Sequence, residues 1–249
     1  IHNLSDAAAL AIALIARRIA RIPADQEHTF GHGRAELIGA VFNLSWLIFI
    51  GLFLIVEAIK RLLDPQPVEG WTVVILASIA LVVDVATVML TYRMAKQSLN
   101  IRAAFIHNLS DALASLGVIV GGVLILTFGW YFIDAIVTLV IAGYILTHAS
   151  MEIPKAIHIL MQGVPRDLDI SDVTKDLEQV DGIIDIHHVH IWHIDEHQRS
   201  FEAHVVVETP AVMERIRMAL RQRLADNFDI THSTLEFEFT PPKPIVGGG

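Results

Sequence analysis

The chain contains no cysteine among its 249 residues, so it has neither a disulfide framework nor a thiolate metal site. Charged residues are also scarce: Asp, Glu, Lys and Arg make up 18% of the sequence, below the share of about a quarter that is usual in soluble domains. No stripe of Lys and Arg marks a surface for nucleic acid, which is therefore excluded as an expected partner. What is abundant is apolar sequence, with 53% hydrophobic residues and a mean hydropathy of +0.54. This composition predicts several membrane-spanning helices.

Apolar stretches predict five spans, at about residues 1–16, 37–59, 72–90, 103–128 and 131–150. As a helix the first would measure only about 22 Å, against about 30 Å of hydrocarbon, so we expect this span to begin upstream of Ile1. Lys and Arg gather around the loops at 17–36 and 91–102. The positive-inside rule therefore predicts that these loops, and everything after the last span, are cytoplasmic. The predicted membrane domain covers residues 1–160.

After Pro165 the composition becomes that of a soluble domain. The pattern predicts a helix at 169–179, strands at 183–194 and 201–208, a second helix from Thr209 to about Asn227, and a strand at 232–239. This αββαβ order indicates a small α+β domain over 161–240, a three-stranded sheet with two helices on one face. A disordered tail is expected over 241–249.

The sequence His-Asn-Leu-Ser-Asp-Ala occurs twice, beginning at His2 and at His107, and each copy leads into apolar sequence. His2 and Asp6, like His107 and Asp111, are four residues apart and so share a helix face. Helix packing alone needs no ionisable groups, and such groups persist in lipid only with a partner. Two facing copies would supply two imidazoles and two carboxylates, a tetrahedral set that suits zinc.

Asp84 is a further ionisable residue, in the third predicted span. It is interpreted as an additional metal ligand, as a proton relay or as a hydrogen-bond partner of Asn108. Because the duplicated motif already provides four ligands, a proton relay or a hydrogen-bonding role is preferred to direct ligation.

Seven of the chain's thirteen histidines lie between His187 and His232. Strict strand alternation would place His188 and His190 on one face and His187 on the other, so that the three cannot share one ion. His204 and His232, on the two later strands, are expected to join one of these sets. Solvated or interface histidines are the alternative, but so many near one sheet favour at least one metal site.

Taken together, these motifs resemble the cation diffusion facilitator family, and within it the bacterial zinc exporters. The resemblance rests on the two His-x-x-x-Asp motifs, the loop His28-Thr29-Phe30-Gly31-His32-Gly33, the strand His187-His188-Val189-His190-Ile191-Trp192, and Thr231-His232-Ser233-Thr234-Leu235-Glu236. It implies a six-span helical bundle whose first span is missing here, followed by a cytoplasmic ferredoxin-like, metallochaperone-like domain. It also implies a homodimer in the bacterial inner membrane and proton-coupled efflux of divalent metal.

The resemblance implies three metal sites: a transport site of His2, Asp6, His107 and Asp111, a loop site of Asp25, His28 and His32, and a C-terminal site of His187, His204 and His232. Thr234 stands where some members have a ligand aspartate, so Glu236 or His190 is the alternative ligand there. Gln162 stands where many members have an acidic residue that pairs with a base near Arg34, so that ion pair is not expected.

Zinc needs neutral imidazole and ionised carboxylate, so the metal and protons compete for the duplicated motif. We therefore expect a Zn²⁺/proton antiporter that works by alternating access and is no enzyme, with Cd²⁺, Co²⁺ and Ni²⁺ as possible further substrates. A membrane metalloenzyme would need an open coordination position and a general base, and no glutamate lies beside the motif. A metal receptor or scaffold would need no site within the membrane.

Overall fold

The computed structural model describes residues 2–64, 70–96, 99–128 and 132–239, with the side chains of residues 2–8, 70, 72, 73, 76, 100, 107 and 125 excepted. The predicted tail at 241–249 lies outside these residues. The chain divides into two units, Ile1–Ile157 and His158–Gly249.

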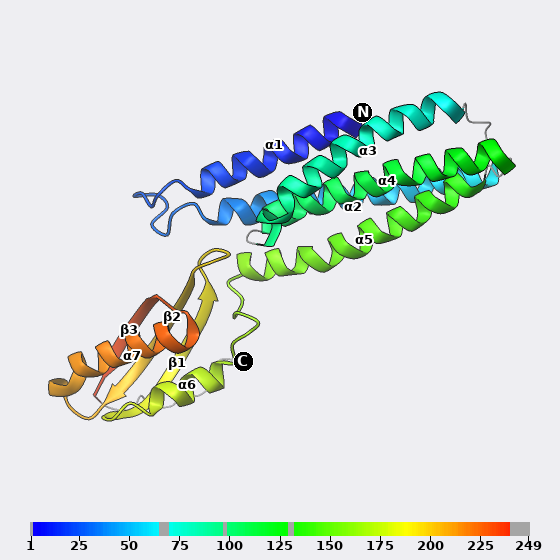
Figure 1. Ribbon diagram of the computed structural model, residues 1–249. Coiled ribbons are helices and arrows are strands. Elements are labelled where there is room, and N and C mark those ends of the chain that lie inside the picture. The colour runs from blue at the N-terminus through cyan, green and yellow to red at the C-terminus, as the bar shows by residue number, and fades with distance from the viewer. Residues whose placement is uncertain (1, 65–69, 97–98, 129–131, 240–249) are drawn as a thin grey trace. The chain divides into compact units, whose positions relative to one another are not determined.

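The first unit is helical, with α1 (His2–Ala20), α2 (Arg34–Leu63), α3 (Gly70–Tyr92), the short 3₁₀ helix η1 (Met94–Lys96), α4 (Leu99–Phe128) and α5, which runs from Phe132 to Leu160. The long helices lie lengthwise beside one another (Figure 1). Among the described residues, three segments are long and apolar enough to cross a bilayer: Arg34–Leu63, Ile101–Phe128 and Phe132–Leu160. Within α3, Ala77–Tyr92 is also apolar but shorter than these three segments.

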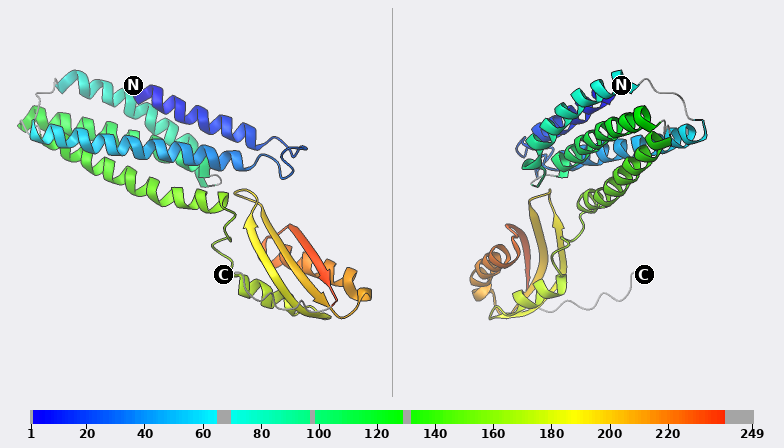
Figure 2. Two further views of the ribbon diagram at one scale, coloured as in Figure 1. Left: turned by 180° about the vertical axis from the view of Figure 1, so that it is seen from behind. Right: turned by 45° about the vertical axis from the view of Figure 1, so that its right-hand side comes forward.

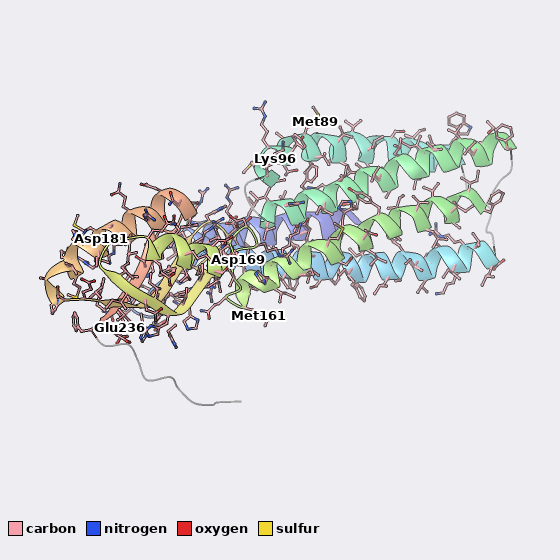
Figure 3. The ribbon with its side chains drawn as sticks, turned by 90° about the horizontal axis from the view of Figure 1, so that it is seen from below. Met89, Lys96, Met161, Asp169, Asp181 and Glu236 are labelled. Atoms are coloured by element: carbon pink, nitrogen blue, oxygen red, sulfur yellow. The ribbon has the colours of Figure 1, made fainter. Side chains whose placement is uncertain are left out.

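Many large apolar side chains point outward from these helices, and alanines are frequent between them, beside buried residues such as Leu44 and Leu47. Phe53, Val82 and Met89 are 60%, 70% and 73% exposed, and Figure 3 shows Met89 pointing away from α3. Ala40, Ala103 and seven further alanines of α2, α4 and α5 are buried. Such an arrangement suits lipid, where helices associate through close packing of small residues and have no hydrophobic drive to hide large ones.

Gly117 of α4 lies tightly against α5. A Cβ built on Gly117 would lie 2.3 Å from Cγ1 of Val137 and 3.1 Å from Cδ1 of Ile141. Since Val137 is β-branched and has little freedom at χ1, it cannot swing away. Only a glycine at this position lets the two helices meet.

Replacing Gly117 with Ala is therefore expected to destabilise the helical unit by about 1–3 kcal/mol, the usual cost of overpacking. The measurement is thermal unfolding of the detergent-solubilised protein. Gly143→Ala on α5 is the matched control, because a Cβ built there meets nothing within 4 Å. Equal melting temperatures for the two variants would show that α4 and α5 are not packed this closely.

The second unit contains α6 (Ile170–Glu178), β1 (Ile183–His193), β2 (Arg199–Val207), the 3₁₀ helix η2 (Pro210–Val212), α7 (Met213–Phe228) and β3 (His232–Glu238). The sheet order is β1-β2-β3, with β1 antiparallel and β3 parallel to β2. A parallel neighbour needs a crossover, and α7 provides it. With the helical unit before it, this α+β fold confirms the predicted fold class.

One face of the sheet forms the core of this unit. Phe201, Ala203 and Val205 alternate along β2 and are fully buried. They form one cluster with Val173 and Leu177 of α6 and Ile216, Leu220 and Leu224 of α7. Figures 1 and 2 show α7 lying across the strands. Both helices thus cover the same face, as the αββαβ pattern predicts, and the histidine-bearing face of β2 stays accessible.

His193, the last residue of β1, is half-buried, and this burial, aided by the nearby Arg199 guanidinium, lowers its pKa. The unfolded chain therefore binds more protons than the folded one in mild acid, so this residue makes the unit less stable as the pH falls through about 6.5. We expect His193→Gln to lessen the loss of β1 amide protection between pH 7.5 and pH 5.5, measured by hydrogen exchange. His197→Gln, at an exposed neighbouring position, should leave that loss as it is, and an identical loss in all three proteins would contradict the prediction.

Candidate metal centres

The two copies of the duplicated motif lie on α1 and α4, and these helices contact each other. Both also pack against α2, where the buried Asn43 donates a hydrogen bond from Nδ2 to the carbonyl oxygen of Ala9, at 3.2 Å. The side chains of His2, Asp6 and His107 lie outside the described residues, so the four-ligand site stays a prediction. Of the four predicted ligands, Asp111 is the one whose side chain the structure describes.

Asp111 lines a cavity of about 340 Å³ between α2, α3, α4 and α5. Asp84 of α3 lines the same cavity and accepts a hydrogen bond at Oδ2 from the Ser115 hydroxyl, 3.0 Å away. The polar residues of the lining are Glu57, Arg61, Asp84, Ser110, Asp111, Ser115, Asp134 and Thr138. An otherwise apolar cavity with a few convergent polar groups is the usual form of a binding site.

Asp84 shares this cavity with Asp111, and this position is compatible with a role as a relay or as an additional ligand. The third interpretation, a hydrogen bond with Asn108, is not found. Nδ2 of Asn108 is buried and has no hydrogen-bond partner within the part of the chain that the structure describes. Ser115, which bonds to Asp84, was not anticipated from the sequence, because thirty-one positions separate the two residues.

The loop between α1 and α2 brings Asp25, His28 and His32 together, with one ligand atom from each within 4.8 Å of the others. Nδ1 of His28 and Nε2 of His32 lie 3.5 and 3.8 Å from the Asp25 carboxylate. Gly31 makes the turn between the two histidines with a positive φ of 77°. Two imidazoles and a carboxylate in one loop fit a divalent metal.

Hydrogen bonds from the backbone keep the Asp25 carboxylate ionised. Oδ1 accepts from the N–H groups of His28, at 2.6 Å, and Glu27, at 2.9 Å. The bond from His28 is the largest cause that lowers the pKa of Asp25. The loop therefore presents a charged oxygen to a metal.

A second described cluster lies on the sheet and consists of His187, His204 and Glu238, with one ligand atom from each within 4.8 Å of the others. Nδ1 of His204 is 2.6 Å from Oε1 of Glu238, and Nε2 of His187 is 3.6 Å from Oε2 of the same carboxylate. All three side chains are partly buried. One carboxylate between two imidazoles forms three ligands of a tetrahedral zinc site.

The prediction of strict alternation along β1 is wrong at this cluster. The register of β1 against β2 shifts between His187 and His190, and His188 has a positive φ of 51°. This β-bulge leaves the rings of both His187 and His188 next to His204, with centroids 5.3 and 4.9 Å away. A bulge adds a residue to one strand and so cancels the period of two on which the prediction depended.

The other predicted C-terminal ligands lie at different distances from this cluster. Glu236, labelled in Figure 3, has Oε2 3.5 Å from Nε2 of His204. The ring of His190 contacts that of His188. His232 pairs with Ser200 at the start of β3, about 13 Å along the strand from Glu236. The structure thus brings together His187 and His204 but does not place His232 in the described three-residue group.

Glu238 is the ligand candidate that the sequence analysis missed. Its signal was available, because Glu236 and Glu238 are two residues apart on a strand and so share a face. The C-terminal motif, however, ended at Glu236, and the register of β3 against β2 was not known.

Residues 1–161 match the family model described as the cation efflux transmembrane domain, and residues 165–239 match that of the cation efflux protein, cytoplasmic domain. The chain belongs to the cation efflux family. It is 34% identical over 241 residues to the metal cation efflux system protein CzcD of Cupriavidus metallidurans, covering 96% of this chain and 76% of the relative. The cadmium, cobalt and zinc/H(+)-K(+) antiporter of Bacillus subtilis is 36% identical (95% and 78% covered). The zinc transporter ZitB of Escherichia coli is 31% identical (96% and 77% covered).

Membership of the cation efflux family confirms the resemblance on which the sequence analysis relied. The protein is an integral membrane protein, and its function is the efflux of metal cations. Because the family's members are transporters, the metalloenzyme and receptor alternatives are not favoured.

Proposed function

We propose that the protein exports Zn²⁺ in exchange for protons, by alternating access of a site formed by His2, Asp6, His107 and Asp111. The observation that carries this proposal is the cavity shared by Asp111 and Asp84 beside the helix that carries one copy of the motif. The contact between α1 and α4 supports the meeting of the two copies.

The proposed exchange follows from the chemistry of the ligands. Imidazole binds zinc only when neutral, and carboxylate only when ionised, so a proton and the metal exclude each other. When the site faces the cytoplasm, it loses protons and binds the metal. When it faces the other side, it meets a higher proton concentration, takes up protons and releases the metal. Asp84, held by Ser115 in the same cavity, is proposed as the relay that passes these protons.

We propose zinc as the main substrate and Cd²⁺, Co²⁺ and Ni²⁺ as others. Two imidazoles and two carboxylates suit zinc but bind these ions with modest differences in affinity. The names of the relatives, which mention cadmium, cobalt and zinc, support this range.

We further propose that the loop site and the soluble unit face the cytoplasm and that two copies of the chain form a dimer. The Lys and Arg residues near the 17–36 and 91–102 loops support the orientation. In this arrangement zinc bound by His187, His204 and Glu238 senses the cytoplasmic metal concentration. Its effect on transport would be a coupling free energy between two sites.

The test is flux in sealed proteoliposomes that carry a zinc indicator and a pH indicator. We expect zinc entry to move protons the opposite way, with rates that rise with the imposed pH difference, for a panel of divalent ions. Zinc binding without flux would identify a receptor, and flux without a proton response would exclude antiport.

A further inference from the structure

An ion pair lies in the lining of the cavity that contains Asp84 and Asp111. Nη1 of Arg61, near the end of α2, lies 2.8 Å from Oδ2 of Asp134 in the first turn of α5. Nε of the same guanidinium is 3.4 Å from Oε1 of Glu57, one turn earlier on α2. All three side chains line the cavity, so one arginine ties two helices together at its rim.

This ion pair lies far along the cavity from Asp111. A Cβ built on Gly121 of α4 would be 3.9 Å from Cα of Asp134, so Gly121 marks the level of the pair. Gly121 is ten residues after Asp111, a rise of about 15 Å, or half the hydrocarbon thickness. The pair is also at the end of α2 opposite Arg34, where the 21–33 loop enters.

The Arg61–Asp134 pair can obstruct a cation that leaves the cavity in this direction. A guanidinium cannot be deprotonated in a protein, so Arg61 can pair with the two carboxylates at every pH, and the paired side chains obstruct the path of the ion. The pair is weak enough to open, because Arg61 is half-exposed and exposed ion pairs are only marginally stable. Movement of α5 away from α2 would separate the pair and remove this steric barrier.

We propose that the Arg61–Asp134 ion pair is the outer gate of the transport cavity. It is closed when the two residues are paired and open when α5 separates from α2. This inference rests on the proposed transport function, from which the outer side is taken.

The test exploits the absence of cysteine from the chain. Ala114→Cys places a single thiol in the cavity wall, and its reaction with a membrane-impermeant methanethiosulfonate is followed from the outer side of oriented vesicles. On this background, we expect Arg61→Gln and Asp134→Asn each to raise the labelling rate about fivefold. Their combination should raise it no further, because the two variants break the same interaction.

Lys60→Gln is the matched control: it removes a neighbouring exposed charge that does not line the cavity, and the labelling rate should not change. An unchanged rate in either single variant, an equal rise with Lys60→Gln, or an additive rise of about 25-fold in the double variant would each overturn the gate. Labelling needs no metal flux. Failure of zinc–proton exchange with normal labelling changes would therefore count against the proposed function and not against the gate.

Discussion

Replacing Asp111 with Asn or Ala is expected to lower proton-coupled zinc flux by about 100-fold or more. Loss of a group that merely orients a metal ligand costs 10–100-fold, and Asp111 is proposed to be a ligand itself. Asn keeps the volume of the side chain but removes the charge that competes for zinc and protons. The measurement is zinc and proton flux in the same proteoliposomes, normalised to the amount of inserted protein.

Asp64→Asn is the control for the Asp111 variants, because it makes the same chemical change at an exposed position at the end of α2. It should transport at close to the parent rate. Retained flux in both Asp111 variants would remove the site assignment, whereas loss of flux in all three would indicate a general effect of lost negative charge.

The second large effect is expected in the soluble unit, where His204→Ala should weaken zinc binding about 100-fold. His204 is the residue through which the cluster is connected, since its ring contacts those of His187 and His188 and its nitrogens approach Glu236 and Glu238. Removing it takes away a ligand and the partner of the Glu238 carboxylate. Zinc affinity is measured by competition with a chelating indicator on the full chain that also carries Asp111→Ala and His28→Ala, to silence the transport site and the loop site.

Glu238→Gln should weaken this binding to a similar degree, and Glu236→Gln less, because Glu236 does not belong to the three-residue group. His197→Ala, in the exposed turn after β1, is the matched control and should bind like the parent. If Glu236→Gln has the larger effect of the two carboxylate variants, the assignment of Glu238 is wrong.

Much of the fold could be predicted because its signals are local. The αββαβ order follows from alternation and helical periodicity, and β1 and β3 begin at Ile183 and His232 as expected. The helices of the membrane part follow from apolar length alone. The loop cluster was expected from the family resemblance, and because Asp25, His28 and His32 lie within eight residues, a single turn decides whether they meet.

The remaining features depend on pairings between distant segments. Arg61 and Asp134 are separated by 73 positions, and nothing in either segment specifies the other. The contact between Ser115 and Asp84 likewise depends on how α3 lies against α4. The Glu238 ligand required the register of a parallel strand, which the crossover through α7 sets and which no local pattern reveals.

The β-bulge at His187–His190 also limits how this proposed zinc site can be transplanted. Grafting the histidines alone onto a regular hairpin would place the rings of His187 and His188 on opposite faces of the sheet, so that only one of them could lie next to His204. A designer would have to copy the additional residue and the left-handed His188 with it. Shortening β1 by that one position here should take the His188 ring away from His204 while leaving the pairing of His187 with His204 and the hydrophobic interior of the unit almost unchanged.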